Sequence, residues 1–354
     1  MSFENRCTFD LHMGHRCNFQ CNYCFIPRTL TGTSSDDVTP EQLDRYADYI
    51  KWMKLQLGPD HEYTMCIFGG EPLLYLDVLH PFLWKLRDDL DIVSITTNGS
   101  LAKAQWGGLR KLKHVLGGKL DVNVSYDFAA QDYTRKAGTY ETIRDGIRWL
   151  HYHGLCHQAI TVFNGKSLPH IDEVFFDFVK LHDELPGFQA KFNLSRTAGE
   201  FDVLDEVAIR AALGKVRSYM DEHPEFEKLF FYNCSMGYQG DRCSDAFYGD
   251  VICAMCAGGL IYPGYDLPYM SDFAQKELLI GRIEDDFAQL EDNRRLLMAK
   301  FPIDAPADCV KCNTVCRVIP WVRMTDSISQ YNAIPDEAHC RVHKLVSEYI
   351  WYRH

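Results

Sequence analysis

Three cysteines near the amino terminus form a compact group with the chemistry to bind metal. Cys17, Cys21 and Cys24 are separated by three and then by two residues, in a segment that begins at Gly14. Three thiolates on one short loop can hold a 4Fe–4S cluster and leave one of its irons open. An open metal position can bind a substrate or cofactor, as it does in catalytic zinc sites. The alternatives are a redox pair made by Cys21 and Cys24, or a zinc site.

Cysteines are also frequent near the carboxy terminus, where eight of the 14 follow residue 222. Four sulfur ligands suit an iron–sulfur cluster or zinc, and spacing does not distinguish the two. The eight divide into one group of Cys234, Cys243, Cys253 and Cys256, for which unligated thiols are a third option, and another of Cys309, Cys312, Cys316 and Cys340. The remaining Cys7, Cys66 and Cys156 lie in apolar segments, where cysteine acts as a small buried hydrophobic residue.

Polar motifs follow three of the predicted strands. They are Gly69-Gly70-Glu71-Pro72, then Thr96-Thr97-Asn98-Gly99-Ser100, then Ser125-Tyr126-Asp127, which Asp132 and Arg135 follow. Each motif also has a structural interpretation: a strand-to-helix turn at Pro72, a turn at Asn98 and a solvated Arg135. For His12 and His15 we expect satisfied or solvated side chains, although either is placed to line a pocket near the triplet.

The triplet, with Tyr23 directly before its last cysteine, resembles the radical S-adenosylmethionine (SAM) enzymes. The resemblance implies that the three cysteines bind a 4Fe–4S cluster and that SAM chelates the open iron. It further implies that an electron from the cluster cleaves SAM to a 5′-deoxyadenosyl radical, which abstracts a hydrogen atom from the substrate. The cofactor would supply this chemistry, and the protein would position and shield it.

The same resemblance assigns roles to the polar motifs. It places Tyr23 near the adenine and the Gly69–Pro72 motif at the SAM amino group, and it gives SAM contacts to Asn98, Ser125 and Asp127. Arg135 would pair with the SAM carboxylate through two parallel hydrogen bonds. The match is partial, because Tyr126 and Phe128 flank Asp127 where a leucine and a glycine are commoner.

The carboxy-terminal cysteines resemble the SPASM or twitch-like extension of many radical SAM enzymes, which carries auxiliary 4Fe–4S clusters. Three features depart from that pattern, and one of them is that the cysteine expected soon after Cys316 is absent. Pro268-Tyr269-Met270 lacks an expected cysteine, and Cys316 follows Cys312 after three residues where five are usual. One or two auxiliary clusters, or zinc in their place, are therefore expected in the two groups of four. A fully ligated auxiliary cluster would accept an electron from a substrate radical.

The elements that must position these residues alternate between strands and helices. The segment from Thr39 to Leu57 is predicted to form a helix. Thr39 would cap it, Pro40 fits its first turn, and Gln42 completes a capping box with Thr39. Strand–helix repeats predict a parallel sheet, with reactive groups at the carboxyl ends of its strands. We expect a partial (β/α)6 TIM-like barrel over residues 1–222 and a cysteine-rich domain over residues 223–354. The predicted strands are Cys7–His12, Tyr63–Phe68, Ile92–Thr97, Leu120–Tyr126, His157–Phe163 and Phe188–Leu194.

Composition excludes several classes of protein. The 354 residues include 37 Lys and Arg against 49 Asp and Glu, and this net charge of −12 argues against nucleic-acid binding. The amino terminus carries no secretory signal, and the apolar run Val251–Tyr265 is too short to span a membrane. Thiols in a protein that is not exported are expected in a reducing compartment, which predicts a cytoplasmic location.

We therefore predict a radical SAM enzyme that oxidatively modifies a peptide or protein side chain, by cross-linking, thioether formation or dehydrogenation. A flavodoxin or ferredoxin is the expected electron donor, and no catalytic acid or base stands out. The chain begins almost at its first strand, without the leader-peptide module of many peptide modifiers. A small molecule, such as an amino sugar or an amino acid derivative, is therefore the alternative substrate. A non-catalytic zinc or iron–sulfur protein is the rival from another class.

Overall fold

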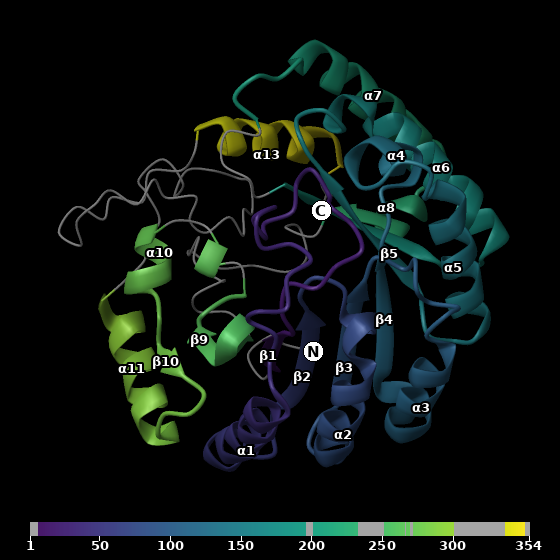
Figure 1. Cartoon of the computed structure of the whole chain (residues 1–354). Coiled ribbons are helices and arrows are strands. Elements are labelled where there is room, and N and C mark those ends of the chain that lie inside the picture. The colour runs from purple at the N-terminus through teal and green to yellow at the C-terminus, as the bar shows by residue number, and fades with distance from the viewer. Residues whose placement is uncertain are drawn as a thin grey trace. The chain divides into compact units, whose positions relative to one another are not determined.

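The computed structural model describes residues 6–195, 201–232, 251–265, 267–269, 272–300 and 337–350, and Figure 1 shows its elements. The chain divides into two compact units. The first comprises Met1–Gln20, Phe25–Asn123 and Asp245–Pro302, and the second Cys21–Cys24, Val124–Ser244 and Ile303–His354. Among the described helices, none is long and apolar enough to cross a membrane.

The first unit is built on a sheet with the strand order β10-β9-β8-β1-β2-β3-β4. Strands β8, β1, β2 and β3 pair in parallel, whereas β9 pairs antiparallel with β8 and β10. The strands are β1 (Arg6–His12), β2 (Glu62–Phe68), β3 (Ile92–Thr97), β4 (Leu120–Ser125), β8 (Val251–Cys256), β9 (Leu260–Tyr262) and β10 (Gly281–Arg282). The α-helices are α1 (Pro40–Leu57), α2 (Leu76–Leu86), α3 (Trp106–Leu116), α10 (Asp272–Glu277) and α11 (Phe287–Lys300), with 3₁₀ turns at Pro72–Tyr75, Gly117–Lys119, Ala257–Gly259 and Leu267–Tyr269.

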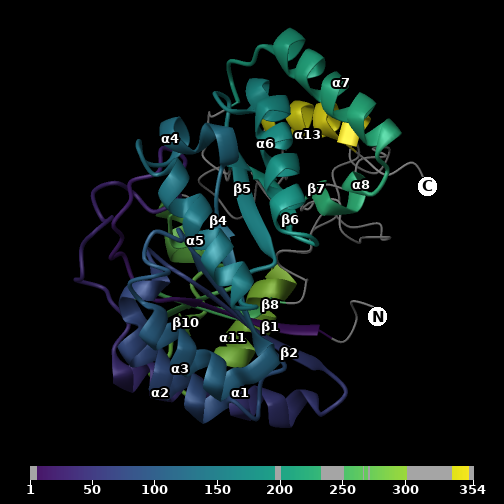
Figure 2. The same cartoon turned by 90° about the vertical axis from the view of Figure 1, so that its right-hand side faces the viewer.

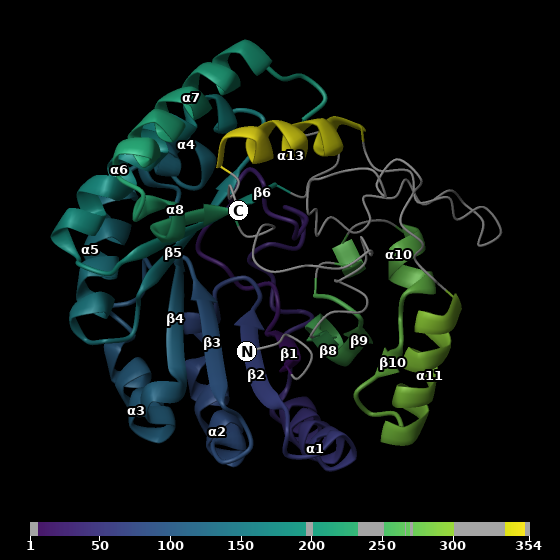
Figure 3. The same cartoon turned by 180° about the vertical axis from the view of Figure 1, so that it is seen from behind.

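Helix α1 forms as its sequence predicts. The Thr39 side chain accepts a hydrogen bond from the Gln42 amide, the Gln42 side chain accepts one from the Thr39 amide, and Pro40 occupies the first turn. Leu43, Tyr46, Ile50 and Met53 are buried on one face, and the helix ends before Gly58, whose φ is 88°. Helices α1, α2 and α3 lie side by side along the outside of the strands (Figures 1 and 3).

The second unit contains the end of β4 and continues in the order β5-β6-β7. These strands pair in parallel, and the ring of Phe178 on α6 lies 5.5 Å from that of Phe230 on β7. Figure 2 shows this side of the protein. The elements are α4 (Gln131–Thr134), α5 (Tyr140–Tyr152), β5 (Gln158–Phe163), α6 (Ile171–Glu184), β6 (Gln189–Leu194), α7 (Glu206–Glu222), α8 (Phe226–Leu229), β7 (Phe230–Tyr232) and α13 (Glu337–Ile350), with 3₁₀ turns η4 (Phe128–Ala130) and η5 (Leu168–His170).

The predicted fold class, an α/β protein with a parallel sheet, is confirmed. Each of the six predicted strands is present, with its ends displaced by at most one residue. The region after residue 222, which was predicted to be a cysteine-rich domain, contributes β8, and this strand extends the sheet beside β1. The predicted domain boundary at residue 222 stays a prediction, and the two compact units follow a different division.

Candidate functional site

The Gly69–Pro72 motif of the first unit packs directly against the backbone that leads to Cys17. The Gly70 amide donates to the Gly14 carbonyl at 2.8 Å, and the Glu71 amide donates to the Arg16 carbonyl at 2.7 Å. Gly69 has a φ of 130°, and a Cβ atom on Gly70 would overlap the Arg16 carbonyl. Glycine is therefore required here by the close approach of two backbone segments.

The carboxylate of Glu71 is fully buried and joins the ends of β2 and β3. Its Oε1 accepts hydrogen bonds from the Thr97 hydroxyl at 2.6 Å and the Leu73 amide at 3.0 Å, and its Oε2 accepts one from the Asn98 amide at 2.7 Å. The Asn98 side chain in turn donates to Asn18 at 2.8 Å. Asn98 thus fixes the residue that directly follows Cys17.

In the second unit, Tyr23 is held by two charged side chains. Its hydroxyl donates to Asp127 Oδ2 at 2.7 Å and accepts from Arg135 Nη1 at 2.8 Å. Asp127 is fully buried and also accepts hydrogen bonds from the Thr134 hydroxyl at 2.6 Å and the Val162 amide at 3.1 Å. Burial raises the pKa of Asp127 and of Tyr23. Arg135, for which a solvated position was one interpretation, contacts Tyr23.

Asn22 and Asn164 belong to this arrangement and were missed in the sequence. The Asn22 amide donates to the Thr134 carbonyl at 2.9 Å, and Asn164 Nδ2 donates to Asn22 Oδ1 at 3.0 Å. Asn164 directly follows β5, as the three expected motifs follow their strands. The position of Asn164 directly after a predicted strand was the sequence signal that could have identified it as a site residue. Ser125 is half-buried at the end of β4, two residues before Asp127.

The donor set of the triplet fits an iron–sulfur cluster. Cys17 lies in the first unit, and Cys21 and Cys24 lie in the second. All three are partly exposed, so inorganic iron and sulfide can reach the thiols. The Phe19 amide donates to Cys17 Sγ at 3.4 Å. Hydrogen bonds to cysteine sulfur are one of the means by which proteins tune such clusters.

The first carboxy-terminal group of cysteines is divided by strand geometry. Cys253 is fully buried under α1, with its Sγ 3.6 Å from the Tyr46 hydroxyl, and burial raises its pKa to about 12. Cys256, three residues later, contacts the carbonyl of Tyr265 at 3.8 Å. Residues three apart on a strand point to opposite faces, so these two thiols do not converge on one metal.

The other members of the two groups lie outside the described residues: Cys234, Cys243, Cys309, Cys312 and Cys316. The backbone of Cys340 lies in α13. Of the three cysteines expected to be buried, Cys7 and Cys156 are buried and Cys66 is half-buried.

His12 differs from its expected state. It is fully buried at the end of β1, and neither ring nitrogen has a hydrogen-bond partner within the described part of the chain. Its ring lies 5.5 Å from that of Tyr269 and 6.2 Å from that of Phe25. Burial lowers the pKa of His12 to about 3, so its ring is neutral. His15, by contrast, is hydrogen-bonded to the Tyr269 hydroxyl at 2.8 Å.

Comparison with known proteins finds a family match over the residues around the cysteine triplet. Residues 11–178 match the family model of the Radical SAM superfamily. The chain is 23% identical over 176 residues to the cysteine-type anaerobic sulfatase-maturating enzyme of Clostridium novyi (strain NT). That alignment covers 46% of this chain and 45% of the relative, so the chain matches less than half the length of this curated protein.

Solved structures resemble the chain over a longer range. Native anSMEcpe with bound AdoMet has a TM-score of 0.68 at 16% identity, covering 97% of this chain and 96% of that one. The same protein with AdoMet and the Kp18Cys peptide has a TM-score of 0.71 at 16% identity, with the same coverage. Streptococcus suis SuiB has a TM-score of 0.51 at 15% identity, covering 73% of this chain and 60% of that one. These likenesses show that the chain shares the fold of anSMEcpe.

Proposed function

We propose that this chain, whose residues 11–178 match the Radical SAM superfamily model, modifies a peptide or protein side chain by a SAM-derived radical. Cys17, Cys21 and Cys24 would hold the cluster that supplies the electron for SAM cleavage. Other residues would position SAM: the Gly69–Pro72 backbone at its amino group, Tyr23 at the adenine, and Asn98, Ser125, Asp127 and Arg135 among the further SAM contacts.

The observation that carries the proposal is the anchoring of the Cys21–Cys24 segment. Tyr23 is bound by Asp127 and Arg135, and Asn22 is bound by Asn164. These side-chain hydrogen bonds hold the two residues between Cys21 and Cys24, while the thiols stay partly exposed. A protein that used these cysteines only as a structural zinc site would gain little from a buried Tyr–Asp–Arg arrangement beside them.

The resemblance to anSMEcpe, solved with a bound peptide, supports a peptide or protein substrate. The sulfatase-maturating relative supports the same class. The modification would be a cross-link, a thioether or a dehydrogenation, and each of these is an oxidation of the substrate. A second cluster at Cys309, Cys312, Cys316 and Cys340 would accept the electron that such an oxidation releases. A flavodoxin or ferredoxin in the cytoplasm would reduce the first cluster.

The test is formation of 5′-deoxyadenosine by protein reconstituted anaerobically with iron and sulfide, after addition of dithionite and SAM. We expect the nucleoside with the natural chain and its loss in Cys24→Ala. The matched control is Cys156→Ala, which removes a buried cysteine of the second unit and should keep nucleoside formation. Bound zinc with no nucleoside would instead support the non-catalytic rival.

The substrate class is tested separately, by offering Cys-containing peptides and a free amino sugar to the same reaction. We expect a SAM-dependent loss of mass in a peptide, detected by mass spectrometry. Modification of the amino sugar with every peptide left unchanged would favour the small-molecule alternative.

A further inference from the structure

Arg135 extends from a short segment after β4 that is folded tightly on itself. The Arg135 amide donates to the Gln131 carbonyl at 3.1 Å, directly after α4. Gln131 is buried, and its side-chain oxygen accepts a hydrogen bond from the Asp127 amide at 3.1 Å. Asp127 Oδ2 accepts one from the Thr134 hydroxyl at 2.6 Å. These hydrogen bonds fix the backbone from which the Arg135 side chain leaves the chain.

Two contacts bring this segment beside the residues that follow Cys21. The Asn22 amide donates to the Thr134 carbonyl at 2.9 Å, so the two backbones are joined one residue after Cys21 and one residue before Arg135. Arg135 Nη1 donates to the Tyr23 hydroxyl at 2.8 Å, and the guanidinium carbon lies 5.9 Å from the centre of the Tyr23 ring. All five residues belong to the second unit. A positive charge is thus held against the segment that carries two of the three thiols.

Cys21 is part of the electrostatic environment of Arg135. Burial lowers the pKa of Arg135, but Cys21, Tyr23 and Asp127 raise it by more, and the net direction is upward. The guanidinium group therefore stays protonated. Its Nε is enclosed by protein atoms, and charges that water does not surround are screened less than charges on the surface. The charge of Arg135 therefore acts on Cys21.

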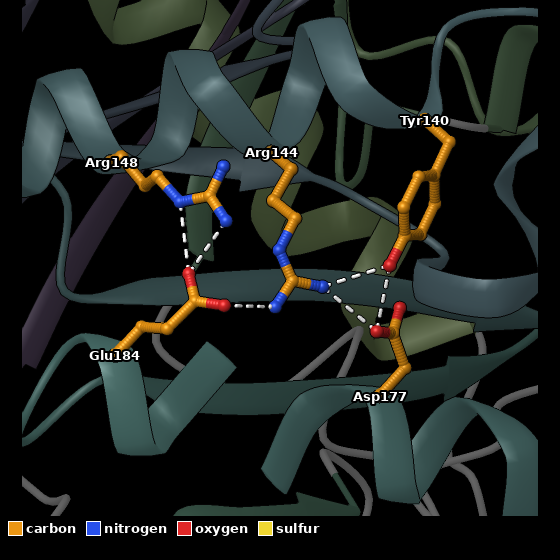
Figure 4. Close-up of polar contacts among 5 residues, drawn as sticks. All are labelled: Tyr140, Arg144, Arg148, Asp177 and Glu184. Carbon is orange, nitrogen blue, oxygen red and sulfur yellow. Dashed lines mark hydrogen bonds and ion pairs between the residues drawn. The ribbon is translucent and has the colours of Figure 1, made fainter. Parts of the chain in front are cut away.

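Arg144, on α5 of the same unit, is a buried arginine with a different environment. Its Nη1 binds Asp177 Oδ1 at 2.8 Å and its Nη2 binds Glu184 Oε1 at 2.8 Å (Figure 4). Glu184 also binds Arg148, so two positive and two negative side chains balance one another between α5 and α6. None of these partners belongs to the cysteine triplet. Arg144 is therefore a structural comparison for Arg135.

We propose that Arg135 raises the reduction potential of the cluster that the triplet would hold, by keeping a positive charge beside Cys21. Reduction adds one electron, and so one negative charge, and net charge is one of the factors that set cluster potentials. The electron comes from the low-potential donor, which is oxidised by one electron. The inference rests on the proposed function, but the effect acts through Cys21 and needs no contact between Arg135 and SAM.

A redox titration of the full chain tests the proposal. The protein is reconstituted anaerobically with iron and sulfide, no SAM is added, and reduced cluster is measured by electron paramagnetic resonance. The signal of the first cluster is the one that Cys24→Ala removes. Arg135→Gln keeps a hydrogen-bond donor and removes the charge. We expect it to lower the ratio of reduced to oxidised cluster about tenfold at a given solution potential, equivalent to a shift of about 59 mV to more negative values.

Three further variants separate the charge from a structural effect. Arg135→Met is a second neutral variant, and it should shift the potential in the same direction as Arg135→Gln. Arg135→Lys keeps the positive charge and should stay close to the potential of the natural chain. Arg144→Gln should lower the free energy of unfolding in urea, because it leaves Asp177 with one donor fewer, but should leave the potential unchanged.

Three results would overturn the proposal. The first is an unchanged potential in either neutral variant of Arg135. The second is an equal shift in Arg135→Lys, since the loss of charge would then not be the cause. The third is an equal shift in Arg144→Gln, which would show that any disturbance of the second unit changes the potential. Assembly of the cluster without formation of 5′-deoxyadenosine from SAM would count against the proposed function alone.

Discussion

Glu71 illustrates how a single buried residue organises the candidate site. Its carboxylate has no exposed surface and accepts hydrogen bonds from the Thr97 hydroxyl and the Asn98 amide, which lie at the end of a different strand. Hydrogen bonds to an ionised group are stronger than neutral ones, and a buried carboxylate is stable only when its oxygens are satisfied. Glu71 therefore fixes the turn that the SAM amino group is proposed to meet.

Replacing Glu71 by glutamine is predicted to destabilise the protein by about 2 kcal/mol, because an amide NH2 group would then face backbone or hydroxyl donors. The measurement is the free energy of unfolding from urea denaturation. Glu277→Gln, which changes an exposed carboxyl group on α10, is the matched control and should have little effect. A Glu71→Gln variant as stable as this control would contradict the role given to Glu71.

His12 predicts a pH dependence of stability. Its pKa is about 3 in the folded protein, where the buried ring stays neutral, and near 6.5 when unfolded. The unfolded chain therefore takes up a proton below pH 6.5 that the folded protein does not, and stability present above that pH is lost as the pH falls toward 3. Between pH 7 and 5.5 the natural chain should lose about 1 kcal/mol more than His12→Leu.

The same urea series at both pH values measures this difference. If the natural chain and His12→Leu lost the same unfolding free energy between the two pH values, His12 would take up its proton in the folded protein as readily as in the unfolded chain. That result would contradict the effect of burial on its pKa.

At the scale of helices and strands, local signals predicted the elements and their ends. The capping box at Thr39 and Gln42 and the apolar face of α1 depend on residues a few positions apart, so the sequence reveals them. The carboxyl ends of β2, β3 and β4 also carry the expected motifs. The partners within the site could not be predicted, because Asp127, Tyr23 and Asn164 are joined across more than 30 residues by tertiary packing.

Strand β8 shows the same limit. Its cysteines were grouped by spacing, but Cys253 packs against Tyr46 on α1 and Cys256 points to the other face. The alternation of a strand separates these two thiols, and the strands predicted from the sequence end at Leu194.

The turn after β2 gives a prediction at this scale. Gly70→Ala should abolish 5′-deoxyadenosine formation and lower stability, because the added methyl group overlaps the backbone at Arg16 and must displace the segment before Cys17. Gly107→Ala is the matched control: it lies in α3 with open space around it, and alanine there should stabilise the helix by up to about 1 kcal/mol. Both variants are compared by thermal unfolding and nucleoside assay. Normal activity in Gly70→Ala would contradict the required close approach.

At the scale of the whole molecule, the number of iron–sulfur clusters per chain can be measured. Replacing Cys17, Cys21 and Cys24 together by alanine should remove about four irons per chain and leave any auxiliary cluster in place. Cys253→Ser is the control, since its thiol is enclosed beneath α1 and should contribute no iron. Iron and sulfide analysis of anaerobically reconstituted protein gives the counts. Loss of iron in Cys253→Ser would show that Cys253 is a ligand after all.

The pairing of β1 with β8 has a consequence for biosynthesis. Thr8 lies opposite Val251, so the edge of β1 is completed by a strand that the ribosome makes long after β1 itself has emerged. Until then, the nascent chain presents an unpaired strand edge, which invites association with other chains. Chaperone dependence during translation is the expected cost of this late partner.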